Sequence, residues 1–138
     1  MERIIKKGRI INQPIAAAIC GLGHTDTITI ADAGLPIPAS TKRIDLALTT
    51  GVPSFVQTLQ VVLEELFVEK AIVAEEMKTV SPQVFEAVGE ILGDVPVDLV
   101  PHVSFKELTA DSKAVIRTGE FTPYANVILV AGAWGFDV

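Results

Sequence analysis

Apolar residues recur along the chain with two spacings, one typical of strands and the other typical of helices. Short runs rich in β-branched and apolar residues predict six strands, at 27–31, 43–49, 68–74, 97–100, 114–117 and 126–131. Between them, apolar residues return every three or four positions, which predicts helices, at 13–20, 54–66, 82–92 and, more briefly, from 104. Strands that alternate with helices indicate a layered α/β fold, with residues 1–138 forming one domain.

Capping residues set the predicted starts of these helices. Asn12, with a proline two residues later, is a typical helix start. Ser54 followed three residues later by Gln57 is a capping box. Ser104 and Glu107 have the same spacing, so a short helix is expected to begin at Ser104.

Composition and charge exclude several classes of protein. Hydrophobic residues make up 49% of the chain, more than a monomer of this size needs, which indicates surfaces covered by other subunits. The net charge of −6 argues against non-specific nucleic-acid binding. No apolar run approaches the length of a membrane span, and the N-terminus lacks the apolar region of a signal peptide, so a cytoplasmic protein is expected. The single cysteine, Cys20, is expected to pack inside the protein.

The stretch 21–38 gathers the most suggestive polar residues. His24 lies beside glycine and two residues before Asp26, which is interpreted as a turn residue or a partner of His24. An imidazole can give and take a proton near pH 7, and a nearby carboxylate can orient it. The alternative is a histidine that interacts with the last carbonyls of the preceding helix. Asp32 ends a predicted strand, where α/β proteins bind ligands, although it could instead cap its own loop.

Other candidate groups are weaker on pattern alone. His102 follows a predicted strand, and a solvent-exposed loop histidine is an equal alternative. Glu75 and Glu76 are interpreted as a turn or a solvated helix entry, because neighbouring residues of a strand point to opposite faces. The chain has no dinucleotide fingerprint, Walker lysine motif or nucleophile elbow, and its two histidines are far apart. We therefore expect neither a metal site nor a cofactor.

Several longer blocks resemble the D-ribose pyranase family, part of the ribose pyranase and fucose mutarotase superfamily. The blocks are Gly-His24-Thr-Asp-Thr, Asp32-Ala-Gly-Leu-Pro-Ile-Pro, Arg43-Ile-Asp-Leu-Ala-Leu-Thr-Thr-Gly-Val-Pro-Ser-Phe, Ala-Val-Ile-Arg117-Thr-Gly-Glu and Pro-Tyr124-Ala-Asn-Val-Ile-Leu. Together they follow the family's order over nearly the whole chain. The resemblance implies a three-layer α/β/α sandwich, assembled into a ring-like homo-oligomer, usually a decamer, with sugar sites at subunit boundaries.

The resemblance also implies an activity and a set of site residues. The family interconverts the pyranose and furanose forms of ribose without metal or cofactor, and related members act on fucose anomers. His24 matches the catalytic acid, and the substrate-binding positions match Asp32, His102, Tyr124, Ala125 and Asn126. The fucose branch has arginine in place of His102 and lacks the Leu-Pro-Ile-Pro run, so the ribose branch is favoured.

Two other functions stay open at this stage. A sugar-binding or regulatory module would bind ribose without accelerating ring exchange. A mutarotase for fucose or another monosaccharide would accelerate exchange of a different sugar. A histidine beside glycine and a carboxylate favours proton transfer, because capture alone needs no group that titrates near pH 7.

Overall fold

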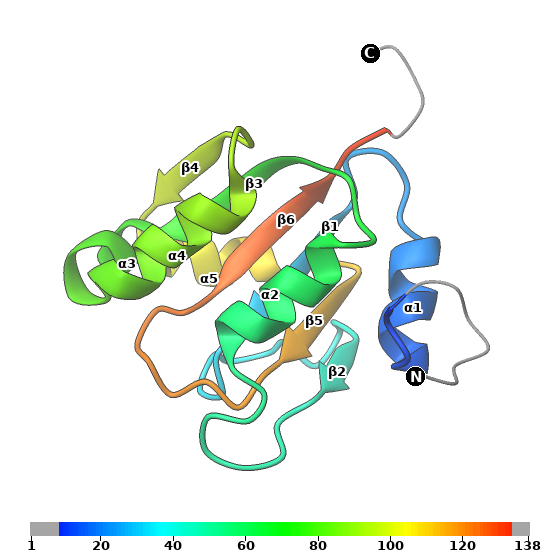
Figure 1. Cartoon of the computed structure of the whole chain (residues 1–138), viewed down its shortest axis with the longest axis horizontal. Helices are drawn as coiled ribbons and strands as arrows, with labels where there is room; N and C mark the ends of the chain where they lie inside the picture. The colour runs from blue at the N-terminus through cyan, green and yellow to red at the C-terminus, as the bar shows by residue number, and fades with distance from the viewer. Residues whose placement is uncertain (1–8, 134–138) are drawn as a thin grey trace.

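A six-stranded sheet with helices on both faces forms the protein (Figure 1). The structure, a computed structural model, describes residues 9–133. Its strands are β1 Thr27–Ala31, β2 Arg43–Asp45, β3 Val68–Ala74, β4 Val97–Val100, β5 Ala114–Arg117 and β6 Val127–Ala131. Its helices are α1 Gln13–Cys20, α2 Phe55–Leu63, α3 Glu75–Val80, α4 Pro82–Leu92 and α5 His102–Thr109. No helix in residues 9–133 is long and apolar enough to cross a membrane.

The strand directions bring polar residues from distant parts of the chain to the same edges of the sheet. The strand order is β2-β5-β1-β6-β3-β4, and β6 runs antiparallel to both of its neighbours. The other five strands run in one direction. We call the edge where these five strands end and β6 begins the carboxyl edge. The opposite edge, where they begin and β6 ends, is the amino edge.

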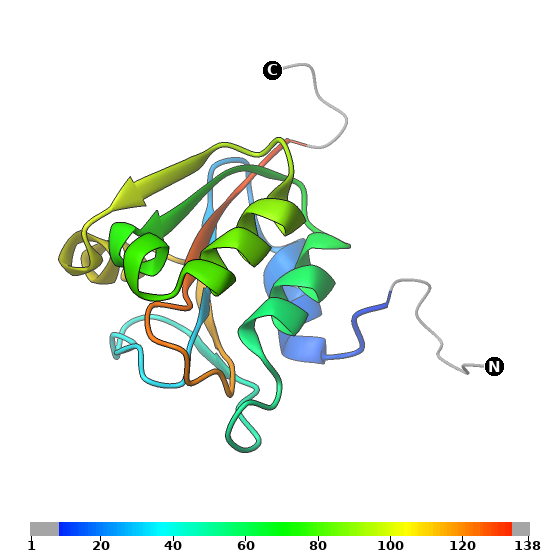
Figure 2. The same ribbon diagram turned by 60° about the vertical axis from the view of Figure 1, so that its left-hand side comes forward.

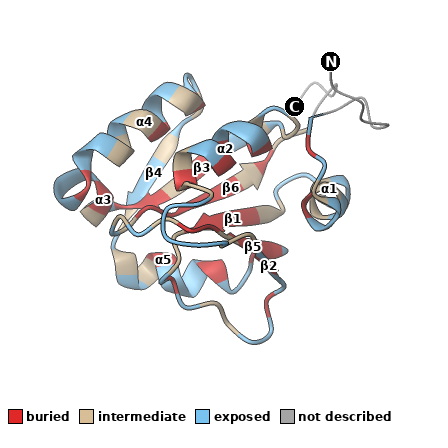
Figure 3. Ribbon diagram, turned by 60° about the horizontal axis from the view of Figure 1, so that its bottom comes forward, coloured by how far each residue is buried: buried red, intermediate tan, exposed pale blue. Residues whose placement is uncertain are grey.

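The sheet separates two apolar cores, as the period-2 alternation of strand residues requires. Ile28 and Ile30 of β1 point into the larger core, which α1, α2, α3 and α4 cover. Ala31, at the end of the same strand, contributes to the smaller core, which includes Phe105 of α5. Figure 2 shows the helices on the two sides of the sheet, and Figure 3 shows buried residues concentrated on its central strands. The predicted α/β/α layering is confirmed.

Four expectations from the sequence were wrong in detail. The second strand ends at Asp45 and not at residue 49, because the Asp45 carboxylate accepts a hydrogen bond from the Ala47 N–H and turns the chain. Helix α2 ends at Leu63, three residues before its predicted end. Helix α5 begins at His102, not at Ser104. Cys20, expected to pack, is exposed.

Glu120 ties the start of α2 to the loop that leads into β6. Its Oε1 accepts a hydrogen bond from the Phe55 N–H at 3.0 Å, and its Oε2 accepts one from the Thr122 hydroxyl at 2.7 Å. Partial burial alone would raise the pKa of Glu120, but the hydrogen bonds from Phe55, Thr122 and Phe121 hold it below its usual value. The negative charge also lies at a helix N-terminus, where the helix dipole favours it.

We expect Glu120→Gln to lower the free energy of unfolding at pH 7 by about 1 kcal/mol, because a charge-assisted acceptor is lost. A depressed folded-state pKa means that the stabilisation is present above the usual value of 4.5 and is lost as the pH falls through the folded-state value. Urea unfolding of both proteins at neutral pH and at mildly acidic pH measures the difference. An equal difference at both pH values would show that the charge does not contribute.

Candidate active site

Asp32 and Asn126 form a hydrogen-bonded pair at the carboxyl edge. Asp32 follows β1 and Asn126 precedes β6, so the antiparallel pairing of these strands brings them together. The Asp32 N–H donates to Asn126 Oδ1 at 2.7 Å, and Asn126 Nδ2 donates to Asp32 Oδ2 at 3.3 Å. The Gly34 N–H donates to Asp32 Oδ1 at 3.0 Å. Both side chains are thus held in fixed orientations from the sheet.

The His102 ring lies at the same edge. Its ring centroid is 4.9 Å from that of Tyr124, in an edge-to-face arrangement, and 6.3 Å from that of Phe105. The Glu76 carboxylate accepts the His102 backbone N–H at 2.9 Å, which starts α5 there. Nδ1 of His102 is buried and has no hydrogen-bond partner among the described residues. An unsatisfied buried nitrogen is costly, and a ligand hydroxyl is a natural partner for it.

Backbone strain marks two of the predicted site segments. Tyr124 has a φ of 62° and Thr25, directly after His24, has a φ of 74°. Residues other than glycine rarely adopt this left-handed region, and a β-branched threonine does so least readily. Such strain persists where the surrounding structure imposes it, and it clusters at functional sites. Ala125, between Tyr124 and Asn126, is completely buried and packs in the larger core.

The Asp32 carboxyl is partly desolvated. Burial raises its pKa above the usual value, and hydrogen bonds from Gly34, Asn126 and Leu35 and the attraction of His102 offset the rise only in part. A cleft of about 260 Å³ opens beside Asp32, lined also by Ala33, Gly34, Arg117, Glu120 and Phe121. The arrangement suits a carboxylate that accepts hydrogen bonds from a ligand's hydroxyl groups.

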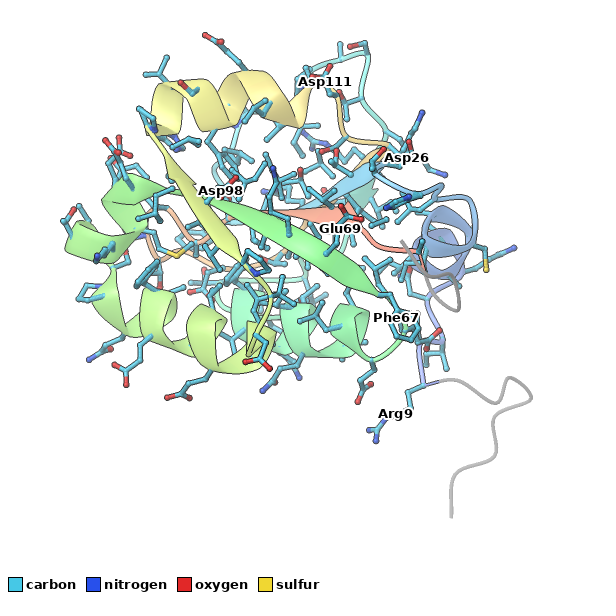
Figure 4. All side chains as sticks on the ribbon, turned by 90° about the horizontal axis from the view of Figure 1, so that it is seen from above. Arg9, Asp26, Phe67, Glu69, Asp98 and Asp111 are labelled. Carbon is cyan, nitrogen blue, oxygen red and sulfur yellow. The ribbon has the colours of Figure 1, made fainter. Side chains whose placement is uncertain are left out.

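His24 lies at the amino edge, away from these residues. It precedes β1, and the Thr25 N–H donates to the carbonyl of Ala131 at the end of β6. Nε2 of His24 lies 2.5 Å from Oε1 of Glu69 in β3, and both side chains are partly exposed. Figure 4 shows Glu69 and Asp26 at the same end of the sheet. Among the described residues, the hydrogen bond of the Asp26 carboxylate is with its own turn: Oδ2 accepts the Gly23 N–H at 2.8 Å.

The sequence left Asp26 as either a turn residue or the partner of His24, and the structure shows the turn residue; Glu69 was missed. Asp26 is close in sequence but serves its own turn, whereas Glu69 is 45 residues away. No local pattern around Glu69 distinguishes it from a solvated strand residue.

The sequence-predicted residues thus fall into two groups. Asp32, His102, Tyr124 and Asn126 come together at the carboxyl edge, which we call the carboxyl-edge cluster. His24 and Glu69 lie at the amino edge, beyond the other end of β1. The five residues of β1 alone span about 16 Å at the usual strand rise, too far for one monosaccharide to touch both groups within one chain. In residues 9–133, no group of three or more His, Cys, Asp or Glu side chains could hold a metal ion.

Comparison with known proteins gives a consistent result. The chain is 52% identical over 128 residues to the D-ribose pyranase of Geobacillus thermodenitrificans, covering 93% of this chain and 97% of that one. It is 51% identical over 136 residues to the D-ribose pyranase of Actinobacillus succinogenes, covering 93% and 98%. Among solved structures, Bacillus subtilis RbsD complexed with D-ribose matches with a TM-score of 0.91 and 47% identity over 94% of this chain and 98% of that one.

More distant structures share the fold. The fucose mutarotase of Streptococcus pneumoniae in complex with L-fucose matches with a TM-score of 0.68 and 20% identity, over 89% of this chain and 94% of that one. The model of the RbsD / FucU transport protein family matches residues 5–134. The chain belongs to the RbsD / FucU transport protein family.

Proposed function

We propose that the protein is an intramolecular isomerase that interconverts the pyranose and furanose forms of D-ribose. The observation that carries the proposal is the identity of about half of all residues, over nearly the full length, with proteins named D-ribose pyranase. The carboxyl-edge cluster and the His24–Glu69 pair supply the two kinds of groups that the reaction needs: acceptors and donors for hydroxyls, and a group that transfers a proton.

The reaction requires only proton transfers and the making and breaking of a hemiacetal bond. A proton is delivered to the ring oxygen while the anomeric hydroxyl loses one, and the ring opens to the aldehyde. A different hydroxyl then attacks the aldehyde and closes the other ring form. No electrons are gained or lost, so the chemistry itself calls for no redox cofactor. A positioned acid–base group accelerates such steps by about 10²–10⁴-fold.

In this proposal His24 is the general acid and the carboxyl-edge cluster binds the sugar. Asp32 and Asn126 hold hydroxyl groups, and hydrogen bonds to the partly desolvated Asp32 carboxylate become stronger in that environment. The unpartnered Nδ1 of His102 takes part in a further hydrogen bond. Tyr124 borders the same place and can hydrogen-bond the sugar or cover one of its faces.

The active unit is a homo-oligomer in which one copy supplies His24 and another supplies the carboxyl-edge cluster. The separation of the two groups along β1 supports this, because one chain cannot bring both to one monosaccharide. Exposed apolar side chains lie near both edges: Val103, beside His102, is 65% exposed, and Phe67, near Glu69, is 57% exposed. Apolar surface of this kind is typical of contacts between subunits. The resemblance implies a decamer, and use of ribose before its phosphorylation implies a cytoplasmic setting.

Exchange between ring forms, followed by NMR saturation transfer on D-ribose, tests the activity. We expect the wild-type protein to accelerate pyranose–furanose exchange strongly and to leave exchange of L-fucose much less affected. Binding of ribose in calorimetry without faster exchange would identify a binding module and overturn the proposal. Faster exchange of L-fucose than of ribose would assign the protein to the mutarotase activity instead.

A further inference from the structure

The contact between His24 and Glu69 has consequences for the mechanism, provided that the proposed function holds. We infer that Glu69 is a positioning residue for His24: it keeps the hydrogen on Nε2 and so makes Nδ1 the atom that exchanges a proton with the sugar. Nε2 of His24 and Oε1 of Glu69 are 2.5 Å apart, within hydrogen-bonding distance.

The tautomer follows from the number of hydrogens available. An ionised carboxylate only accepts hydrogen bonds, so Nε2 must be the donor in this contact. A neutral imidazole carries one hydrogen, and with that hydrogen on Nε2 the other nitrogen, Nδ1, is a free acceptor. The protonated ring carries a second hydrogen, which is then on Nδ1.

The proton balance of ring opening is complete with these groups. The Nδ1–H bond breaks and an O–H bond forms at the ring oxygen, while the anomeric hydroxyl gives its proton to water. The imidazole becomes neutral and keeps its Nε2 hydrogen bonded to Glu69, so the carboxylate does not itself take up a proton. Ring closure in the other form reverses these transfers. Glu69 thus orients the ring and fixes its tautomer, as carboxylates do for catalytic histidines in other enzymes.

The local backbone holds the two side chains toward each other. The pairing of β3 with β6 shifts register between Val68 and Lys70, so Glu69 is the residue at a β-bulge. Bulges redirect side chains and are frequent next to active sites. On the histidine side, Thr25 adopts its left-handed φ of 74° while its N–H is tied to the Ala131 carbonyl.

The end of β6 lies close to both the Glu69 bulge and Thr25. The Gly132 N–H donates to the Phe67 carbonyl at 2.6 Å. A Cβ added at Gly132 would lie 3.3 Å from that carbonyl oxygen and 3.6 Å from the Glu69 Cβ. The bulge, the strained Thr25 and this close approach all involve the same end of β6, which indicates a geometry that the fold maintains.

Substitution of Glu69 separates this role from a structural one. In Glu69→Gln the side chain keeps its size but loses its charge, and Glu69→Ala removes the contact. Asp26→Asn is the matched control, because Asp26 is a nearby carboxylate that bonds the Gly23 N–H instead of the imidazole. We expect the exchange rate on ribose to fall by about 10- to 100-fold in both Glu69 variants and to change little in the control. Ribose affinity in calorimetry should stay within about twofold of wild type.

Ring ¹⁵N chemical shifts of His24 give a readout that does not depend on activity. The chain has two histidines, so His24→Gln assigns the signals. We expect only the Nε2–H tautomer in the wild type and in Asp26→Asn, and a measurable share of the Nδ1–H tautomer in Glu69→Ala. An unchanged ratio of the two tautomers in Glu69→Ala would overturn the inference, as would exchange at the wild-type rate in Glu69→Gln and Glu69→Ala. If the wild type does not accelerate ribose exchange while the tautomer still depends on Glu69, the proposed function fails but the positioning contact stands.

Discussion

His24→Ala and Asp32→Ala, each nearly inactive alone, are expected to regain ribose exchange when they are mixed in one oligomer. The expectation follows from the separation of the two groups by the length of β1. If a site takes His24 from one copy and Asp32 from another, a mixed oligomer contains some sites in which both residues are intact. With equal amounts and random assembly, about a quarter of the sites are fully wild type at these positions.

Each single variant should lose activity for a different reason. If His24 is the general acid, its removal abolishes proton delivery to the ring oxygen, and exchange should fall by about 10²–10⁴-fold. Without Asp32, the carboxylate that Asn126 and Gly34 orient is missing, and ribose should bind poorly. Each variant keeps the residue that the other lacks. Activity can therefore recover in a mixed oligomer only if one site combines residues from two copies of the chain.

The experiment requires exchange of subunits, by co-expression or by unfolding and refolding the two variants together. Light scattering checks that the oligomer forms, and NMR saturation transfer measures exchange. The control mixes His24→Ala with the double variant that carries both His24→Ala and Asp32→Ala. No site in this mixture can contain an intact His24. Recovery only in the first mixture supports the shared site. Absence of recovery in oligomers that demonstrably contain both variants would show that each chain builds its site alone.

The sequence predicted the strands more accurately than the contacts at their ends. The bounds predicted for β1, β3, β4 and β5 match the structure. Strands β1 and β5 are mostly apolar or β-branched runs between polar residues, β4 lies between two prolines, and β3 ends where the acidic pair Glu75-Glu76 begins. The strand at Arg43–Asp45 was predicted too long, because its apolar alternation continues into a segment that the Asp45 carboxylate turns. Local periodicity does not register such a side-chain bond.

The long-range partners of the site residues had no local signal. Glu76, interpreted as part of a solvated helix entry, does lie in the first turn of α3, but its carboxylate also accepts the His102 N–H from 26 residues away. That bond explains why α5 starts at His102 and not at the capping-box serine, Ser104. His24 likewise pairs with Glu69 and not with Asp26. The family resemblance predicts the roles of the carboxyl-edge residues, while their grouping at one edge depends on the antiparallel placement of β6.

Asp32→Asn is expected to make the protein more stable at neutral pH while weakening ribose binding. Burial raises the folded-state pKa of Asp32 above the usual value of 3.8, so the ionised carboxylate is less favourable in the folded protein than in the unfolded chain. The wild type therefore loses stability as the pH rises from the usual pKa through the folded-state value, and this loss is complete at neutral pH. An asparagine has no charge to desolvate and keeps an oxygen for the Gly34 N–H.

We expect a gain in unfolding free energy on the order of 1 kcal/mol at pH 7, in line with the usual trade between stability and function. In the proposed complex, hydroxyl groups of the sugar donate to the carboxylate, and such charge-assisted bonds are worth about 1.5–3 kcal/mol. Their weakening should reduce ribose affinity by about 10- to 100-fold. Chemical denaturation at several pH values, at one fixed protein concentration, and calorimetry with ribose measure the two effects.

Asp45→Asn is the matched control, because the pKa of that carboxyl is shifted in the opposite direction. Burial acts to raise the pKa of Asp45, but hydrogen bonds from the Ala47 N–H and Arg117, with the nearby positive charges, hold it below its usual value. Asp45→Asn should thus lose stability at pH 7, and the difference from wild type should shrink as the pH falls through the folded-state pKa. For Asp32→Asn the gain should instead fade toward zero below pH 3.8, where the wild-type side chain is neutral in both states. A loss of stability in Asp32→Asn that grows with rising pH would show that the Asp32 carboxylate stabilises the fold. That result would contradict the expectation that the carboxylate lowers stability in order to bind sugar hydroxyls.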